Sequence, residues 1–111
     1  MNRMAISPTA AALLRALIGR AAVGRDRVIL SNLSSVDWRS LTFTGERHEI
    51  ELRVSGPDSD RVAERMCDGL EDAEFSIPGI FVADIAMVGA PVRGSDGSTS
   101  LMIEALTVSA D

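Results

Sequence analysis

The 111-residue sequence lacks lysine and tyrosine, and it contains one cysteine, one histidine and one tryptophan. The single cysteine, Cys67, excludes an intramolecular disulfide and fits a reducing compartment. A metal site needs several histidine, cysteine or carboxylate ligands at workable spacing, which one histidine and one cysteine do not supply. We therefore expect neither a metal nor another cofactor. All basic residues are arginines, which is typical of a GC-rich genome.

Positive charge and long apolar runs are also scarce. The formal net charge is −5 at pH 7, whereas a dedicated nucleic-acid-binding domain normally has a basic patch and a high pI. No apolar run approaches the roughly 20 residues that span a bilayer. Arg15 and Arg20 interrupt the apolar stretch near the N-terminus, which argues against a secretory signal. We expect no specific nucleic-acid binding and no membrane association.

Hydrophobic residues are abundant for so short a chain, at 46%. A chain of this length fits one domain, over residues 1–111. Because a small domain buries only part of its surface, much apolar area is expected to stay outside the core. Copies of the chain can bury this area against one another, so the composition favours a homo-oligomer.

Two segments have the apolar periodicity of amphipathic helices. Ser7 and Pro8 are typical of an N-cap and a first turn, and Gly24 is placed to end the first helix. The second helix is predicted from about Ser59 to Glu74. The two apolar stripes consist of Leu13, Leu14, Leu17, Ile18 and Ala21, and of Val62, Ala63, Met66, Cys67, Leu70 and Ala73.

Four segments have the composition of β-strands. They are Arg27–Val36, the alternating segment His48–Val54, Ile80–Val88 and Leu101–Val108. Asp37–Gly45 is interpreted as a long hairpin loop or a strand with a bulge at Gly45, and Gly89–Ser100 as a flexible loop. The order α-β-β-α-β-β predicts an α+β fold, a four-stranded mainly antiparallel sheet with two helices packed on one face.

The last two strands predict two unequal sheet faces. The face under the helices is expected to consist of Phe81, Ala83, Ile85 and Met87 beside Leu101, Ile103 and Ala105. The reverse face is expected to consist of Val82, Asp84, Ala86, Val88, Met102, Glu104 and Leu106. This second face is too apolar for full solvation, so we interpret it as partly buried in a neighbouring subunit.

The residues with catalytic chemistry do not form a recognisable constellation. Glu49 and Glu51 point to the side of their strand opposite His48, so packing or a hydrogen bond is the simpler role for the histidine. Asp84 and Glu104 are either a carboxylate pair for acid/base work or partners of an arginine, in the chain or across a subunit boundary. The available arginines are Arg47, Arg53 and Arg93.

Two further residue types have alternative interpretations. Cys67 lies at the edge of the helical stripe, where a buried structural thiol is favoured over a nucleophile. Trp38 and Phe43 lie in a predicted loop region, where they serve either core packing or contact with a partner.

Several motifs from about Arg27 to the C-terminus occur in a characteristic order. They are "VDWRS" (36–40), "TGERHEIELRVSG" (44–56), "ERMCDGLEDAEFSIPG" (64–79), "FVADIAMV" (81–88) and "LMIEALT" (101–107). This order resembles the tail-completion, or tail-terminator, family of long-tailed phages, which also occurs in the gene transfer agents of alphaproteobacteria. The most specific matches are Asp37-Trp38, Gly45, Arg47-His48 and the segment Leu70–Phe75.

The resemblance implies a structural virion protein rather than an enzyme. It implies a ring of six subunits that caps the head-proximal end of the tail tube, stops its polymerisation and joins tail to head. The implied partners are further copies of the chain, the tail tube protein and the head-tail connector protein, and DNA passes through without specific binding. The implied location is the virion tail, after assembly in the bacterial cytoplasm.

The ring contacts are expected from the second sheet face and from the loops Asp37–Gly45 and Gly89–Ser100. The candidate interface residues are Trp38, Arg39, Phe43, Arg47, Asp84, Arg93 and Glu104. Two rival hypotheses stay open at this point. One is a dimeric binding or regulatory module, and the other is a small enzyme that uses His48 with Asp84 or Glu104.

Overall fold

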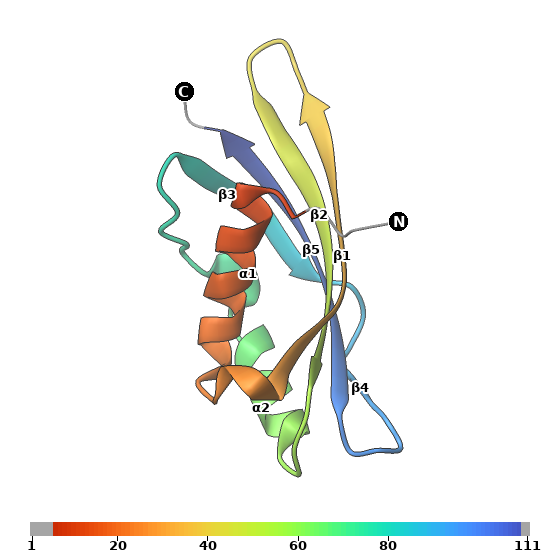
Figure 1. The fold of residues 1–111 in the computed structure, drawn as a ribbon. Helices are drawn as coiled ribbons and strands as arrows, with labels where there is room; N and C mark the ends of the chain where they lie inside the picture. The colour runs from red at the N-terminus through yellow and green to blue at the C-terminus, as the bar shows by residue number, and fades with distance from the viewer. Residues whose placement is uncertain (1–5, 110–111) are drawn as a thin grey trace.

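One antiparallel sheet forms the framework of the computed structural model, which describes residues 6–109 (Figure 1). The spatial order of its long strands is β1-β2-β5-β3, and the two-residue strand β4 pairs with β5. The strands are β1 (Val28–Arg39), β2 (Thr44–Val54), β3 (Ile80–Met87), β4 (Val92–Arg93) and β5 (Thr99–Ser109). The predicted α+β fold is confirmed, and β4 is a short addition inside the predicted loop 89–100.

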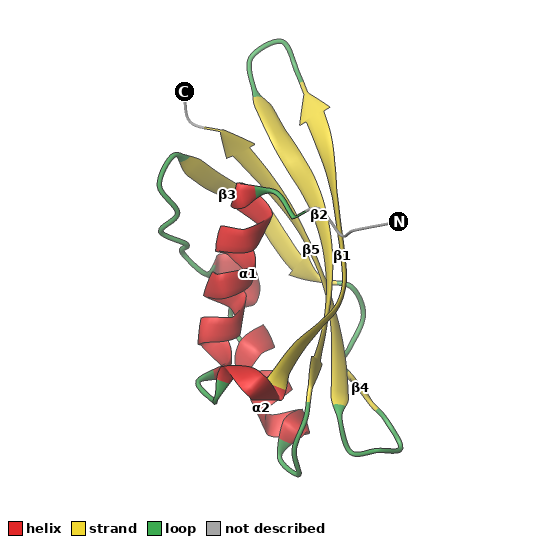
Figure 2. Cartoon of the chain, in the orientation of Figure 1, coloured by secondary structure: helices red, strands yellow, loops and turns green. Residues whose placement is uncertain are grey.

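Two helices cover one face of the sheet and leave the other face without a helix (Figure 2). They are α1 (Pro8–Ala21) and α2 (Ser59–Cys67), each followed by a 3-10 turn, η1 (Arg25–Arg27) and η2 (Leu70–Asp72). Ser7 caps α1 as predicted, since its hydroxyl accepts a hydrogen bond of 3.0 Å from the backbone N–H of Ala10. The helix ends at Ala21 and not at Gly24, because Ala22 adopts the left-handed conformation with φ 55°.

The second helix is shorter than the sequence pattern predicts. It ends at Cys67, two residues before Gly69, which has a positive φ of 68°. The prediction of helix as far as Glu74 is therefore wrong. Leu70 is nevertheless buried, because the turn η2 returns this apolar residue to the sheet.

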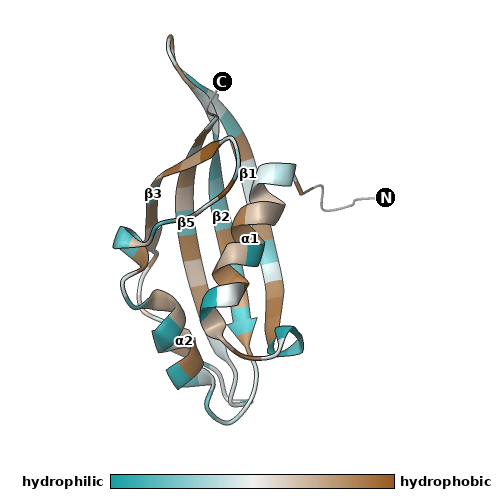
Figure 3. Cartoon of the chain, turned by 90° about the vertical axis from the view of Figure 1, so that its left-hand side faces the viewer, coloured by the Kyte–Doolittle hydropathy of each residue, from teal (hydrophilic) through white to brown (hydrophobic). Residues whose placement is uncertain are grey.

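The core lies between the two helices and the sheet, where apolar segments of helices and strands face each other (Figure 3). The alternation predicted for residues 48–54 is confirmed, since His48 and the apolar residues Ile50, Leu52 and Val54 are fully buried. The other fully buried large apolar side chains are Leu13, Leu17, Val62, Met66, Leu70, Leu101 and Ile103.

The segment predicted as a long loop is mostly strand. β1 runs to Arg39, and its register with β2 continues without interruption from Asn32 through the pair Trp38–Gly45. The loop between the two strands is therefore short, and the irregularity of the register lies between Leu30 and Asn32 rather than at Gly45. As a result the β1–β2 hairpin extends beyond the helices at one end of the molecule (Figure 1).

The register of β3 also differs from the prediction. A bulge between Val82 and Asp84 places Ala83 outside the regular pairing with β5. Because a one-residue shift reverses the orientation of the side chains, Phe81 faces away from the helices and is 66% exposed. Val82 takes its place against the core. The predicted helix-facing set of this strand is therefore correct for Ile85 and Met87 and wrong for Phe81 and for Ala83, which is exposed in the bulge.

Candidate functional site

The sheet face without helices, which we call the open face, is the most extensive candidate surface. Strand register and alternation assign its residues. They are Ile29, Asn32, Ser34, Val36 and Trp38 of β1, Gly45, Arg47, Glu49, Glu51 and Arg53 of β2, Met102, Glu104, Leu106 and Val108 of β5, Phe81, Asp84 and Ala86 of β3, and Val88. The predicted second face is thus present, with Phe81 in place of Val82.

Large apolar side chains gather at the hairpin end of the open face. Val36 and Phe81 are 61% and 66% exposed, and Val108 and Leu106 lie between them on β5. The hairpin loop adds Leu41, which is fully exposed, and Phe43, which is 53% exposed. Of the two aromatic residues that were expected either in the core or at a partner, Phe43 is therefore available to a partner.

Trp38 is anchored at the base of the hairpin. Its indole N–H donates a hydrogen bond of 3.3 Å to the backbone carbonyl of Thr107 on β5. The ring crosses over Gly45, where an added Cβ would overlap the Thr107 carbonyl oxygen and approach the indole nitrogen to 2.8 Å. Only glycine fits at this position, so Trp38 and Gly45 form one structural unit that fixes the hairpin to β5.

Charged side chains occupy the middle of the open face. Glu49 lies directly opposite Glu104, and like charges in this arrangement are destabilising. Asp84 and Glu104 form no ion pair with an arginine among residues 6–109, so the in-chain version of that prediction is wrong. The version across a subunit boundary stays a prediction. Arg47, Asp84 and Glu104 do line one shallow depression together with Leu106.

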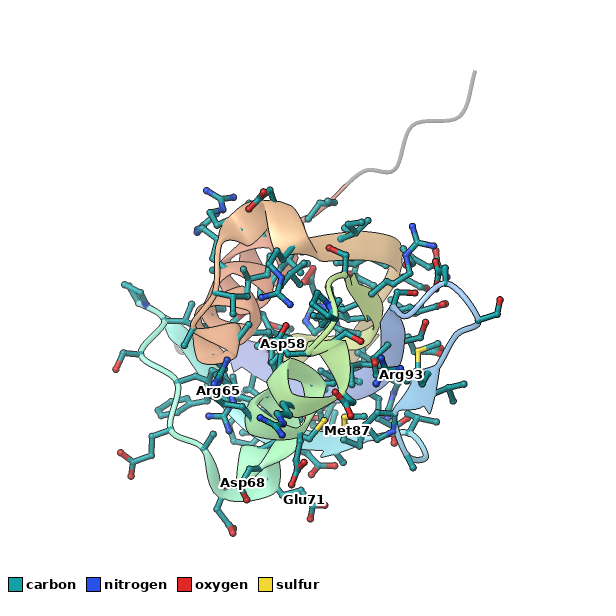
Figure 4. The ribbon with its side chains drawn as sticks, turned by 90° about the horizontal axis from the view of Figure 1, so that it is seen from below. Asp58, Arg65, Asp68, Glu71, Met87 and Arg93 are labelled. Atoms are coloured by element: carbon teal, nitrogen blue, oxygen red, sulfur yellow. The ribbon has the colours of Figure 1, made fainter. Side chains whose placement is uncertain are left out.

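Arg93 is separated from this group. Its guanidinium pairs with Asp60 of α2 at 3.3 Å, and it lies beside α2 at the end opposite the hairpin (Figure 4). Its contact with the backbone carbonyl of Pro57 also ties the loop around β4 to the start of α2. Among the candidate interface residues, Arg93 therefore has a role within the chain.

His48 lies in a buried polar cluster on the helix-covered side of the sheet. Its Nδ1 is 2.7 Å from the hydroxyl of Ser35, and its Nε2 is 2.9 Å from the hydroxyl of Thr107. The carboxylate of Glu46 lies 3.7 Å from Nε2 and accepts a hydrogen bond of 2.7 Å from the hydroxyl of Ser7. Burial lowers the pKa of His48, and the nearby Glu46 charge only partly opposes this effect.

This cluster does not include the carboxylates of the enzyme hypothesis. His48 is on the opposite side of the sheet from Asp84 and Glu104, so the structure does not assemble these three residues. Glu49 and Glu51 also point away from His48, as predicted. Glu46 was not predicted as a neighbour of His48, although it precedes His48 by two residues and alternation places both on one side of the strand.

A cleft of about 510 Å³ opens at the hairpin end of the sheet, beyond the start of α1. Trp38 and Arg39 line it, together with the carboxylates of Asp37 and Glu46. The remaining lining residues are Thr9, Thr44, Gly45, Ile80, Thr107 and Ser109. In the described part of the chain, no group of three or more histidine, cysteine, aspartate or glutamate residues is placed to hold a metal ion.

Cys67 is partly buried at the end of α2. Its Sγ lies 3.3 Å from the sulfur of Met87, which lies beside α2 in Figure 4. Burial raises the pKa of the thiol, and the Arg20 charge opposes this effect only in part. These features agree with the structural role predicted for this residue.

We expect Cys67 to react slowly with a neutral alkylating reagent, because the thiolate is the reactive form and burial disfavours it. At pH 8 iodoacetamide should modify it at least about tenfold more slowly in the folded chain than in urea, as monitored by mass spectrometry. Equal rates in the two states would contradict this assignment.

The comparisons with known proteins give no match: no protein-family model, no curated protein and no solved structure corresponds to this chain. Between residues 6 and 109, neither helix is long and apolar enough to cross a membrane.

Proposed function

We propose that this chain is a structural virion protein that forms a ring at the head-proximal end of the tail of a long-tailed phage or a gene transfer agent. In this role the ring stops the growth of the tail tube and joins the tail to the head. Its partners are copies of itself, the tail tube protein and the head-tail connector protein.

The observation that carries the proposal is the open face, which has exposed apolar residues at one end and, in its middle, carboxylates that form no ion pair within residues 6–109. Monomeric soluble proteins rarely expose apolar patches of this kind unless a partner covers them. Val36, Phe81 and the hairpin residues Leu41 and Phe43 supply apolar area for such a contact. Asp84 and Glu104 supply charges that an arginine of a partner can neutralise.

The motif residues behind the resemblance offer a second argument. Trp38 and Gly45 fix the hairpin, and His48 ties β1, β2 and β5 together from within. These positions therefore define the shape of the surface rather than a reaction centre. A rigid and shaped surface is what an assembly protein requires.

Deletion of the gene in its source genome tests the proposal. We expect electron microscopy to show heads without attached tails and tail tubes of uncontrolled length, with a complete loss of particles that deliver DNA. Expression of the wild-type chain in trans should restore normal particles. Normal tails in the deletion strain would refute the proposed role.

The purified chain provides an independent test. Sedimentation velocity over a range of concentrations should show a closed oligomer, or a monomer that becomes one, and negative-stain images should show rings. A chain that stays monomeric at all concentrations, or that stops at a dimer, would contradict the ring.

A further inference from the structure

The outer surface of α1 and the open face have opposite charge. From the cap residue Ser7 to Ala22, α1 and its flanks contain no aspartate or glutamate. Arg15 of α1 and Arg25 of η1 are exposed and line a hollow of about 270 Å³ together with Ile18, Gly19 and Val23. The exposed Asp26 of η1 follows Arg25, so these two arginines and this carboxylate have a formal charge of +2 − 1 = +1. We call this surface the α1 hollow.

The open face has a negative formal charge and an apolar depression, so it is complementary to the α1 hollow. It contains four carboxylates and two guanidiniums, those of Arg47 and Arg53, so its formal charge is −4 + 2 = −2. The carboxylates are those of Glu49, Glu51, Asp84 and Glu104. An apolar depression of about 210 Å³, lined by Glu51, Val88, Val92 and Met102 among others, adjoins them.

One molecule cannot bring these two surfaces together. The α1 hollow is formed by residues of the helical layer, and the open face is on the opposite side of the sheet from that layer, as the edge-on view of Figure 2 shows. A contact between them therefore requires a second copy of the chain. Two open faces packed against each other are disfavoured. The Glu49 and Glu104 carboxylates of one copy would lie against the same carboxylates of the other copy, and like charges across a contact repel.

We propose that the α1 hollow of one copy packs on the open face of the next, with Arg15 and Arg25 opposite the central carboxylates. Each copy then uses two different patches, which is the heterologous type of contact that closes rings. The proposal deepens the proposed function and rests on it, since it names the two surfaces that join neighbouring subunits of the ring.

Charge exchange tests the contact by sedimentation velocity at low salt. Arg15→Glu and Glu104→Arg should each weaken association by about tenfold, because each places like charges across the contact. The double variant should return to within about threefold of the wild type. It also has the same net charge as the wild type, since −5 − 2 + 2 = −5.

Arg61→Glu is the matched control, because Arg61 is an exposed arginine of α2 outside both surfaces and its replacement makes the same charge change as Arg15→Glu. This variant should associate as the wild type does. Circular dichroism establishes that each variant is folded. The proposed contact would be wrong if Arg15→Glu and Glu104→Arg each associated like the wild type. It would also be wrong if the double variant associated more weakly than either single variant.

Cross-linking provides a second measurement in a Cys67→Ser background. Gly19→Cys places a thiol in the α1 hollow, where an added Cβ meets no atom within 4 Å, and Val88→Cys places one on the open face. Oxidation of the variant with both cysteines should give covalent oligomers larger than dimers. Efficient dimers from Val88→Cys alone, without larger products from the pair, would show open faces packed together and overturn the contact.

The outcomes separate the contact from the function. If the wild-type chain forms rings and charge exchange has no effect, only the contact is wrong. If the wild-type chain never associates, both are wrong. If charge exchange and cross-linking behave as expected and the deletion strain makes normal tails, the contact stands and the tail function falls.

Discussion

Gly45→Ala is expected to lower the free energy of unfolding by about 3 kcal/mol, because the new methyl group has no space. It would overlap the Thr107 carbonyl oxygen and approach the Trp38 indole nitrogen to 2.8 Å, so β2 and β5 must separate. Backbone atoms form one side of this contact and cannot rotate away. Urea unfolding followed by tryptophan fluorescence measures the change, since Trp38 is the only tryptophan and lies at the site.

Gly19→Ala is the matched control for this prediction. Apart from its chain neighbours and the nearby backbone of α1 itself, no atom lies within 4 Å of a Cβ at position 19, and the residue is part of α1. Because alanine favours the helix over glycine, this variant should be more stable by about 0.5–1 kcal/mol. If Gly45→Ala proved as stable as the wild type, the close packing of Trp38 on Gly45 would be wrong.

The same substitution bears on assembly. The Trp38–Gly45 unit holds the hairpin against β5, and the hairpin presents Leu41 and Phe43 at its end. At temperatures where Gly45→Ala is still folded, its hairpin should be displaced, and any ring contact made there should weaken. Loss of association before loss of secondary structure would separate the two effects.

The regular parts of the fold were predictable because their signals are local. The alternation from His48 to Val54 requires only that one side of a strand is buried. The cap at Ser7 depends on a hydroxyl and the first free N–H groups of one helix. Each feature is decided by neighbours in the sequence, and each appears in the structure as expected.

The features that escaped prediction depend on distant segments. The bulge near Ala83 reflects how β3 pairs with β5, and it moves Phe81 to the open face without any local signal. The course of β1 through Trp38 depends on its pairing with Gly45 and on the bond to Thr107. The short α2 is different, because Gly69 is a local helix-ending signal in the sequence, whereas the apolar stripe continues past it to Ala73.

The buried cluster combines both kinds of information. Its pair Glu46 and His48 was accessible from alternation alone. Ser7, Ser35 and Thr107 come from three other elements, and only tertiary packing brings them to the histidine. The sequence therefore predicted a structural histidine held by packing or a hydrogen bond, without identifying its partners.

His48→Ala is expected to lower the free energy of unfolding by about 3 kcal/mol, since it leaves a cavity and removes the partner of the buried Thr107 hydroxyl and of the partly buried Ser35 hydroxyl. The imidazole is fully buried and forms hydrogen bonds with Ser35 and Thr107. Its removal therefore breaks side-chain bonds that join β2 to β1 and to β5. Urea unfolding of the variant and the wild type at pH 7.5 measures this change in the free energy of unfolding. An effect below about 1 kcal/mol would contradict the structural role of the cluster.

The pH dependence of stability is the sharper test of the same cluster. The pKa of His48 is lowered in the folded chain from its ordinary value of 6.5, so the unfolded chain binds a proton first as the pH falls. Stability is therefore complete above pH 6.5 and declines below it, by up to about 1.4 kcal/mol per pH unit, until the folded-state pKa is reached. Asp58 and Asp96 have pKa values lowered from 3.8, so their contributions decline only in more acidic solution.

Urea unfolding at pH 7.5 and at pH 5.5 should therefore show a loss of about 1 kcal/mol for the wild type. His48→Gln retains hydrogen-bonding groups and does not titrate, so its free energy of unfolding should change much less over the same interval. The difference between the two slopes isolates the histidine, because all other titratable groups are shared. Parallel slopes would mean that His48 is protonated as easily in the folded chain as in the unfolded one, and the buried cluster would then be incorrectly described.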